Sequence, residues 1–142
     1  MTYHQILHEP GDTRDFTKSI LVKSGETINI ETLMEFIAPN TAGNTLIKAV
    51  VMPKGNLSLK GVIRISKNAQ NSEAFLKHSI LLVGNDSQAV SIPELEIENN
   101  QVQASHASAI GPIDQSQLFY LMSRGFSKKS AIKLIIKSFL AA

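Results

Sequence analysis

Short runs of aliphatic and β-branched residues, each ended by a turn signal, recur through most of this 142-residue chain. Between about residue 19 and residue 111 the runs are spaced roughly 15–20 residues apart. Their centres lie near Ile28, Ile47, Ile63, Leu81 and Leu95. Turn-forming groups such as 53–56 and 84–86 separate them. The chain is therefore predicted to be mainly β, with short strands.

Two β architectures fit this pattern. A β-solenoid stacks rungs, so that each rung buries its apolar face against its neighbours. An antiparallel sandwich accommodates strands of the same length, and the spacing alone does not separate the two. A helical bundle or coiled coil is disfavoured, because charged residues make up only 18% of the chain and uncharged polar residues take their place.

The strand pattern has local breaks. Runs over 27–30 and 33–37 are treated as separate strands. Val90 and Ile92 precede Pro93, and Leu95 and Ile97 alternate with glutamates after it. Residues 1–18 carry no comparable pattern.

The last thirty residues or so change to a helical period. Asp114 is placed to cap a first helix, and Gly125 to end it in a left-handed conformation. Ser127 is placed to cap a second helix. One face of that helix should carry Ala131, Leu134, Ile135 and Phe139. We therefore divide the chain into a β core over 1–112 and a helical hairpin over 113–142.

The absence of cysteine limits the chemistry of the chain. It excludes a disulfide framework, a thiolate zinc site, a self-contained cysteine-ligated cluster and a cysteine nucleophile. The longest purely aliphatic run, 80–83, is far too short to cross a membrane. We expect a soluble cytoplasmic protein.

Histidines and glutamates are the candidate metal or acid–base residues. His4 and His8 have a spacing that suits a metal pair on a helix, but no helix signal surrounds them. His106 lies among small residues, where another chain can approach closely. Glu94, Glu96 and Glu98 alternate with apolar residues, which favours a solvated strand face over a metal or acid–base site.

The net charge of +2 is unevenly distributed. From Arg124 onward the chain has five cations and no acidic residue. Lys129, Lys133 and Lys137 follow one helix face. We interpret this stripe as a solvated face and do not expect nucleic-acid binding, because few aromatic residues accompany it.

An ordered set of residues over 93–139 strongly resembles the SufB/SufD family of iron–sulfur cluster assembly proteins. The matching residues are Pro93-Glu94-Leu95-Glu96-Ile97, Val102, Ser105-His106, Gly111, Ile113-Asp114, Gln117-Leu118-Phe119-Tyr120-Leu121, Ser123-Arg124-Gly125, Ala131 and Phe139. Upstream, 61–65, 69–70 and 81–83 also look like the core of that family. The resemblance implies a right-handed parallel β-helix with a C-terminal helical hairpin.

The resemblance also implies a function. The chain would be a non-catalytic scaffold subunit of a SUF-type complex, not an enzyme. It would pair through its β-helix, as a homodimer or as a heterodimer with a SufB-like subunit, and would dock a SufC-type ABC ATPase. By the same resemblance, His106 is a candidate for binding a cluster or metal. Phe119, Tyr120, Arg124 and Gly125 belong to the candidate ATPase-docking hairpin.

Departures from the family refine this expectation. Ala104 stands where the family has a cysteine before Ser-His, and Ala107 where the SufD type has glycine. The chain therefore looks more like a SufD-type helper, with no stably bound cofactor and at most a transient iron or iron–sulfur cluster at a subunit interface. An alternative is a β-solenoid interaction module that has lost cluster work. A metal-dependent enzyme built on His106 and the glutamate face is the weakest alternative, because no ligand set of known spacing is present.

Overall fold

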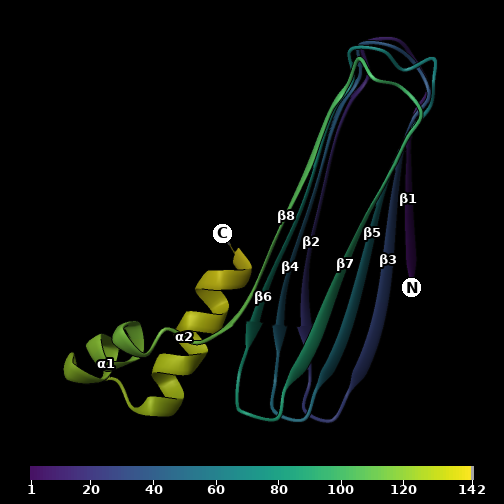
Figure 1. Ribbon diagram of the computed structural model, residues 1–142. Helices are drawn as coiled ribbons and strands as arrows, with labels where there is room; N and C mark the ends of the chain where they lie inside the picture. Colours follow the sequence, from purple (N-terminus) through teal and green to yellow (C-terminus); the bar gives the residue numbers. More distant parts are fainter. Residues whose placement is uncertain (142) are drawn as a thin grey trace.

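Eight strands alternate between two sheets in the computed structural model, which describes residues 1–141 (Figure 1). The strands are β1 (Thr2–Leu7), β2 (Thr13–Val22), β3 (Thr27–Phe36), β4 (Ala42–Val51), β5 (Asn56–Ile65), β6 (Glu73–Leu82), β7 (Gln88–Ile97) and β8 (Gln103–Pro112). One sheet has the order β1-β3-β5-β7 and the other β2-β4-β6-β8, and every ladder is parallel. Each turn of the chain thus adds one strand to each sheet. The β-solenoid is confirmed, and the antiparallel sandwich is excluded.

The rungs repeat with a nearly constant register. Thr13, Ala42, Glu73 and Gln103 follow one another as Cα partners, at intervals of 29, 31 and 30 residues. A full turn therefore takes about twice the spacing seen in the sequence, because each turn holds two apolar strands.

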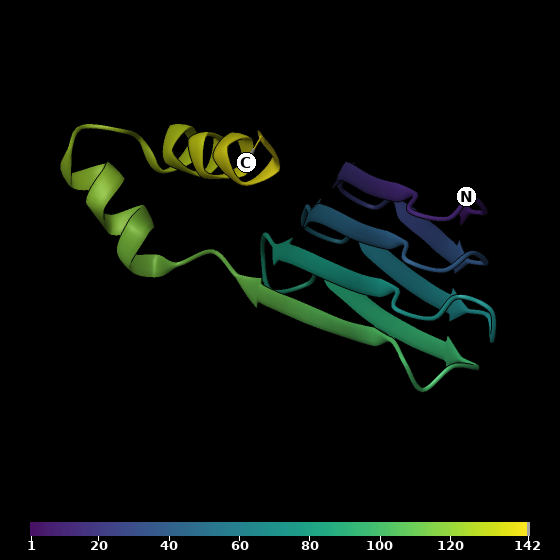
Figure 2. The same ribbon diagram turned by 90° about the horizontal axis from the view of Figure 1, so that it is seen from above.

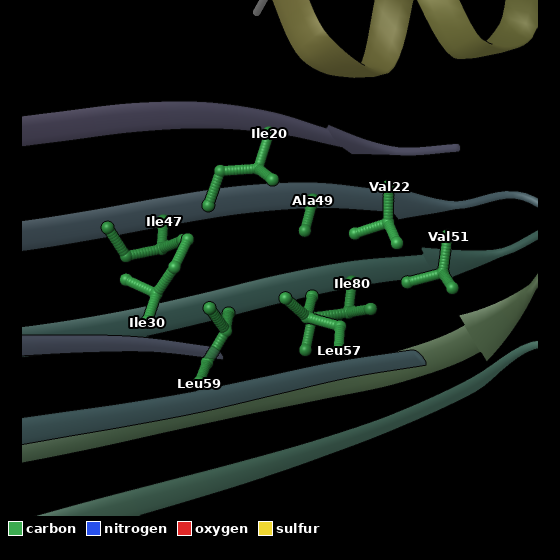
Figure 3. Close-up of a cluster of buried hydrophobic side chains, with 9 residues drawn as sticks. All are labelled: Ile20, Val22, Ile30, Ile47, Ala49, Val51, Leu57, Leu59 and Ile80. Carbon is green, nitrogen blue, oxygen red and sulfur yellow. The ribbon is translucent and has the colours of Figure 1, made fainter. Parts of the chain in front are cut away.

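The interior of the solenoid is filled by alternate residues from both sheets (Figure 3). A strand points successive side chains to opposite faces, so the inward positions form aliphatic stacks from rung to rung. Ile47 and Ala49 are fully buried, and Leu59 is 1% exposed. Side chains stacked in this way lose their water only when neighbouring rungs are present.

Four strands differ from the sequence-based expectation. The runs over 27–30 and 33–37 form one strand, β3, instead of two. The residues on both sides of Pro93 likewise form one strand, β7, which lies at the edge of its sheet. Proline is tolerated there because its missing N–H removes no ladder hydrogen bond toward a further strand. Residues 1–18 hold β1 and the first part of β2.

Two helices follow the solenoid, α1 (Gln115–Ser123) and α2 (Lys128–Ala141). The Asp114 carboxylate accepts a hydrogen bond from the Ser116 N–H, and the Ser127 hydroxyl accepts one from the Ser130 N–H, as predicted for the two caps. Gly125 has φ +101°, a conformation that other residues adopt only with strain. Ala142, the end of the predicted hairpin region, lies outside the described residues.

Helix α2 turns back along the outer face of the β2-β4-β6-β8 sheet, toward the first rungs (Figure 2). Ala131 and Ile135 are buried against Val50 and Leu81 of that sheet. Near the end of α2 the Ser19 hydroxyl donates to the carbonyl of Leu140. Leu134, predicted for the buried face of α2, is 38% exposed. No helix within residues 1–141 is long and apolar enough to span a membrane.

Candidate functional site

The last rung of the solenoid leaves its interior uncovered. Strands β7 and β8 end their sheets, so their inward side chains have no further rung above them. Leu95, Ile97 and Ile110 are 38%, 41% and 42% exposed there. Their register partners one rung earlier are 1%, 0% and 3% exposed: Ile63, Ile65 and Ile80. We call this surface the open end. It is an exposed apolar surface of the kind that marks contact with another protein.

His106, the predicted cluster or metal candidate, lies at the open end. It is on β8, and its Cα partner Leu76 is 2% exposed, so both residues are on the inward face of their sheet. His106 itself is exposed, because β8 is the last strand. An imidazole is thus presented on this exposed apolar surface.

A second histidine, His78, is buried one rung below. Its side chain is on β6, is 1% exposed, and has Ser108 of β8 as its Cα partner. The Nδ1 atom of His78 is 2.7 Å from the Ser91 hydroxyl of β7, and Ser91 is hydrogen-bonded to Ser108. Burial, with a smaller contribution from nearby His106, lowers the pKa of His78 to about 4. His78 is therefore neutral at physiological pH.

Gly61 provides the space that His78 occupies. A Cβ atom at Gly61 would lie 3.1 Å from Nε2 of His78 and 2.6 Å from a methyl carbon of Leu76. The Nε2 atom is buried without a hydrogen-bond partner among residues 1–141. A larger residue at position 61 would thus displace the His78 ring or the Leu76 side chain.

The chain alone does not provide a complete metal centre among its described residues. No group of three His, Cys, Asp or Glu side chains within residues 1–141 is close enough to hold a metal ion. His106 offers a single nitrogen ligand, and neutral imidazole is a good ligand for iron. An iron or iron–sulfur cargo at His106 would need its remaining ligands from another molecule.

The glutamates of β7 lie on the outer face of the solenoid, away from the interior positions. Glu94 is 3.4 Å from the Lys60 ammonium, and Glu96 is 2.6 Å from the Arg64 guanidinium. Hydrogen bonding to Glu96 raises the pKa of Arg64. These exposed ion pairs follow the expected solvated strand face and do not join His106.

His4 and His8 are not brought together as a pair. His4 is on β1 and contacts the Glu35 carboxylate at 2.7 Å, whereas His8 lies beyond the strand, 3.4 Å from Glu9. An interval of four residues places side chains together on a helix, but separates them along a strand.

The hairpin exposes the residues that the family resemblance assigns to docking. Phe119 is 75% exposed and Tyr120 55% exposed. The Arg124 guanidinium lies over the Tyr120 ring, 5.4 Å from its centroid, and Nε of Arg124 is 3.3 Å from the Tyr120 hydroxyl. Gly125 closes α1 directly after them. The four residues therefore lie on α1 or directly after its last residue, and a contact is seen between Tyr120 and Arg124.

Helix α2 adds a basic rim to an apolar groove. The groove has a volume of about 550 Å³ and lies between α2 and two corners of the solenoid. Its lining residues are Met52, Pro53, Val83, Lys128, Lys129, Ile132, Lys133 and Ile136. Lys129 and Lys133 of the predicted basic stripe thus border apolar surface as well as solvent.

Sequence reasoning missed the polar group around His78. The alternation of Ala74, Leu76, His78 and Ile80 was the signal that could have found it, because it puts His78 on the apolar face. Ser91 and Ser108 had no comparable signal, since their contact depends on β7 and β8 facing each other across the interior.

These features define a structural class: a β-solenoid with an open, histidine-bearing last rung and a helical hairpin with exposed aromatic residues. The family model for the SufBD core domain of SUF-system iron–sulfur cluster assembly matches residues 1–139. The chain therefore belongs to the SufBD core domain family, as the residues over 93–139 predicted.

Curated relatives agree with this assignment. An iron–sulfur cluster assembly SufBD family protein of Mycobacterium tuberculosis (strain ATCC 25618 / H37Rv) is 32% identical over 75% of this chain and 12% of its own length. Iron–sulfur cluster assembly protein SufB of Bacillus subtilis is 28% identical over 99% of this chain and 30% of its own length. A SufBD family protein of Staphylococcus aureus (strain USA300) is 29% identical over 72% of this chain and 22% of its own length. The chain thus spans less than a third of each of these relatives.

Proposed function

We propose that this chain is a scaffold subunit of a SUF-type iron–sulfur cluster assembly complex. It pairs through the open end of its solenoid and presents its hairpin to an ABC-type ATPase. The observation that carries the proposal is the exposure of His106 among uncovered aliphatic side chains, in a chain of the SufBD core domain family. A complex driven by ATP also implies a cytoplasmic location.

Pairing at the open end follows from two properties of the last rung. Its aliphatic side chains lose contact with water only when another surface covers them. Strands β7 and β8 also have unpaired backbone groups along their outer edges, which invite a further strand. The partner is a second copy of this chain or a SufB-like subunit.

Iron and sulfide are cargo in this proposal, and this chain does not hold them as a resident cofactor. His106 supplies an imidazole nitrogen, and the thiolate ligands come from the paired subunit or from a small thiol, because this chain has no cysteine. The role is that of a scaffold, in which the chain positions ligands and does no acid–base chemistry of its own.

The hairpin supplies the ATPase contact. Phe119 and Tyr120 offer a large exposed aromatic surface, and aromatic and arginine side chains dominate binding energies at interfaces. The lysines of α2 steer this surface toward an acidic partner, which raises the association rate more than the affinity.

Light scattering on a size-exclusion column tests the docking proposal. The chain should co-elute with a SufC-type ATPase, and Tyr120→Ala or Arg124→Ala should weaken the complex at least tenfold. Phe75→Ala is the matched control, because Phe75 is an exposed aromatic residue on β6 and not on the hairpin. An ATPase complex that tolerates both hairpin substitutions would contradict the docking proposal.

The second candidate is an interaction module that has the family fold without cluster work. The absence of cysteine and of a three-ligand group within residues 1–141 favours it. His106→Ala separates the two functions. It should impair cluster formation by the complete complex if this chain is a working scaffold, and should be silent if the chain is only an interaction module.

A further inference from the structure

A hydrogen-bonded chain connects the buried His78 ring to the open end. It runs from Nδ1 of His78 to the Ser91 hydroxyl, and from Ser91 to the Ser108 hydroxyl. His78 is buried, Ser91 is half-buried and Ser108 is exposed. The three side chains come from β6, β7 and β8, so the chain crosses the solenoid from one sheet to the other and back.

The surroundings of Nε2 determine where the His78 ring carries its proton. Nε2 has no hydrogen-bond partner in the described part of the chain, and it faces Gly61 near the Leu76 methyl groups. A buried N–H without an acceptor is rarer and costlier than a buried lone pair without a donor. The neutral ring therefore carries its proton on Nδ1 and donates it to the Ser91 oxygen.

This tautomer determines which group donates and which accepts in each hydrogen bond from His78 to Ser108. A hydroxyl oxygen can accept two hydrogen bonds but has one hydrogen to donate. Since the Ser91 oxygen accepts from His78, and Ser108 is the other described partner of Ser91, donation to the Ser108 oxygen is what satisfies the Ser91 hydrogen. The Ser108 hydroxyl hydrogen is then not used in either of these two hydrogen bonds, so the hydroxyl can act as a donor at the open end. Ser108 is two residues from His106 on the same face of β8, so the O–H and the imidazole serve the same surface.

We propose that His78 and Ser91 position the Ser108 hydroxyl to donate a hydrogen bond to an anionic sulfur, a sulfide or thiolate, held beside His106 at the open end. This inference rests on the proposed function, because iron–sulfur cargo at His106 brings such sulfur atoms to this surface. His78 and Ser91 are positioning residues, and Ser108 is the residue that contacts the ligand.

A purely structural role explains the His78 position less well. Burying an imidazole costs free energy unless it is hydrogen-bonded, and an aliphatic residue would fill the same interior position without that cost. The His78 ring also fits only because position 61 is a glycine, since a Cβ atom there would lie 3.1 Å from Nε2. What the polar chain adds is a fixed donor at the surface.

Nitrogen NMR of the chain labelled with ¹⁵N-histidine tests the direction first. His78 should show a protonated Nδ1 and an unprotonated Nε2 near neutral pH, and its signals are assigned by their loss in His78→Asn. Observation of the opposite tautomer would reverse the direction of donation, so that Ser108 donates to Ser91 and offers only an acceptor at the open end. That result would overturn the inference.

Cluster loading tests the ligand. The chain is incubated without oxygen with ferric iron, sodium sulfide and excess dithiothreitol, which supplies thiolates, and the retained iron and sulfide are measured after desalting. Hydrogen bonds to sulfur stabilise the reduced, more negative cluster and raise its reduction potential. Ser108→Ala should therefore retain the cluster but shift its potential to more negative values. Ser91→Ala should shift it less, because the hydroxyl remains but is no longer held.

Matched variants and a second loading condition complete the experiment. Ser108→Thr keeps the hydroxyl and should restore the parental potential, and Ser105→Ala, on the outward face of β8, should leave it unchanged. Loading with ferric iron and dithiothreitol alone distinguishes the source of the sulfur. A shift that persists without sulfide assigns the bond to a thiolate, and a shift that needs sulfide assigns it to the sulfide.

Two outcomes would overturn the inference. The first is a parental potential in Ser108→Ala. The second is a parent chain that retains no iron or sulfide. Neither outcome affects the ATPase complex, which is measured separately, so failure of this inference is distinguishable from failure of the docking proposal.

Discussion

The first and last rungs of the solenoid are built on the same ladders but cover their interiors differently. In the first rung, long inward side chains bridge the two sheets. Arg14 of β2 donates to the Gln5 side chain of β1 at 3.1 Å, and the Tyr3 and Phe16 rings are 5.3 Å apart. The Lys18 ammonium lies 5.2 Å from the centre of the Tyr3 ring. These contacts cover the interior from one sheet to the other.

The last rung has short side chains at most of the corresponding central positions. The inward residues there include Ala89, Ser91, Pro93, Ala104 and Ser108. A hydrogen bond between two serines is the bridge that spans the rung, and the larger aliphatic residues toward the ends of the strands remain exposed. The difference teaches that a solenoid end is covered by side-chain length, not by strand pairing. An end without long bridging side chains is one that another surface can cover.

The largest predicted effect is the difference in unfolding free energy between a substitution in an interior rung and one in the last rung. Ile47→Ala should lower the free energy of unfolding by about 2–5 kcal/mol, because it leaves a cavity at a fully buried position. Ile110→Ala should change it by less than about 1 kcal/mol, since Ile110 is 42% exposed. Urea unfolding of both variants, at concentrations too low for pairing, measures the two values. Equal losses would show that the last rung is covered within the monomer.

Acid should weaken the rung beneath the open end. The pKa of His78 is about 4 in the folded chain, below the ordinary value of 6.5, so the unfolded chain takes up its proton first as the pH falls. Stability is therefore lost between about pH 6.5 and pH 4, by up to about 3 kcal/mol.

The difference between parent and His78→Asn isolates that contribution. Urea unfolding at several pH values should show a steeper acid loss in the parent than in His78→Asn. Identical slopes in the parent and in His78→Asn would mean that the His78 ring is in contact with water in the folded chain and is not buried beneath the last rung.

A smaller difference in unfolding free energy is predicted between substitutions in the first rung and in the last rung. Phe16→Ala removes a half-buried ring that packs on Tyr3, and should cost about 1–2 kcal/mol of unfolding free energy. Leu95→Ala, in the last rung, should change the unfolding free energy of the monomer by less than about 0.5 kcal/mol. Thermal unfolding monitored by circular dichroism ranks the two. A larger loss in Leu95→Ala would reverse the comparison.

The sequence predicted the fold best where apolar residues alternate with few interruptions. The strands around Ile47 and Ile63 and both helix caps follow local rules, and the structure confirms them. The first part of β2 escaped notice because Arg14 and Lys18 occupy inward positions, where the alternation rule expects apolar residues. Such charges are acceptable only because their ends reach the rim of the first rung.

The site was predictable only in part. His106 followed from the family resemblance, and its exposure at the last rung followed from no local signal. The contact between Ser91 and Ser108 joins strands that are not hydrogen-bonded neighbours, so it depends on the number of residues in the corner between β7 and β8. Local propensity carries no information about such a contact across the interior.

The most direct test of pairing at the open end is the solution mass of the chain, measured by light scattering alone and with a SufB-type subunit. We predict an association that Ile110→Glu abolishes without changing the circular dichroism spectrum, because the substitution puts a charge on the apolar surface. Lys18→Glu, a charge change in the first rung, should leave the association intact. An association that survives Ile110→Glu, or none with either partner, would contradict the account.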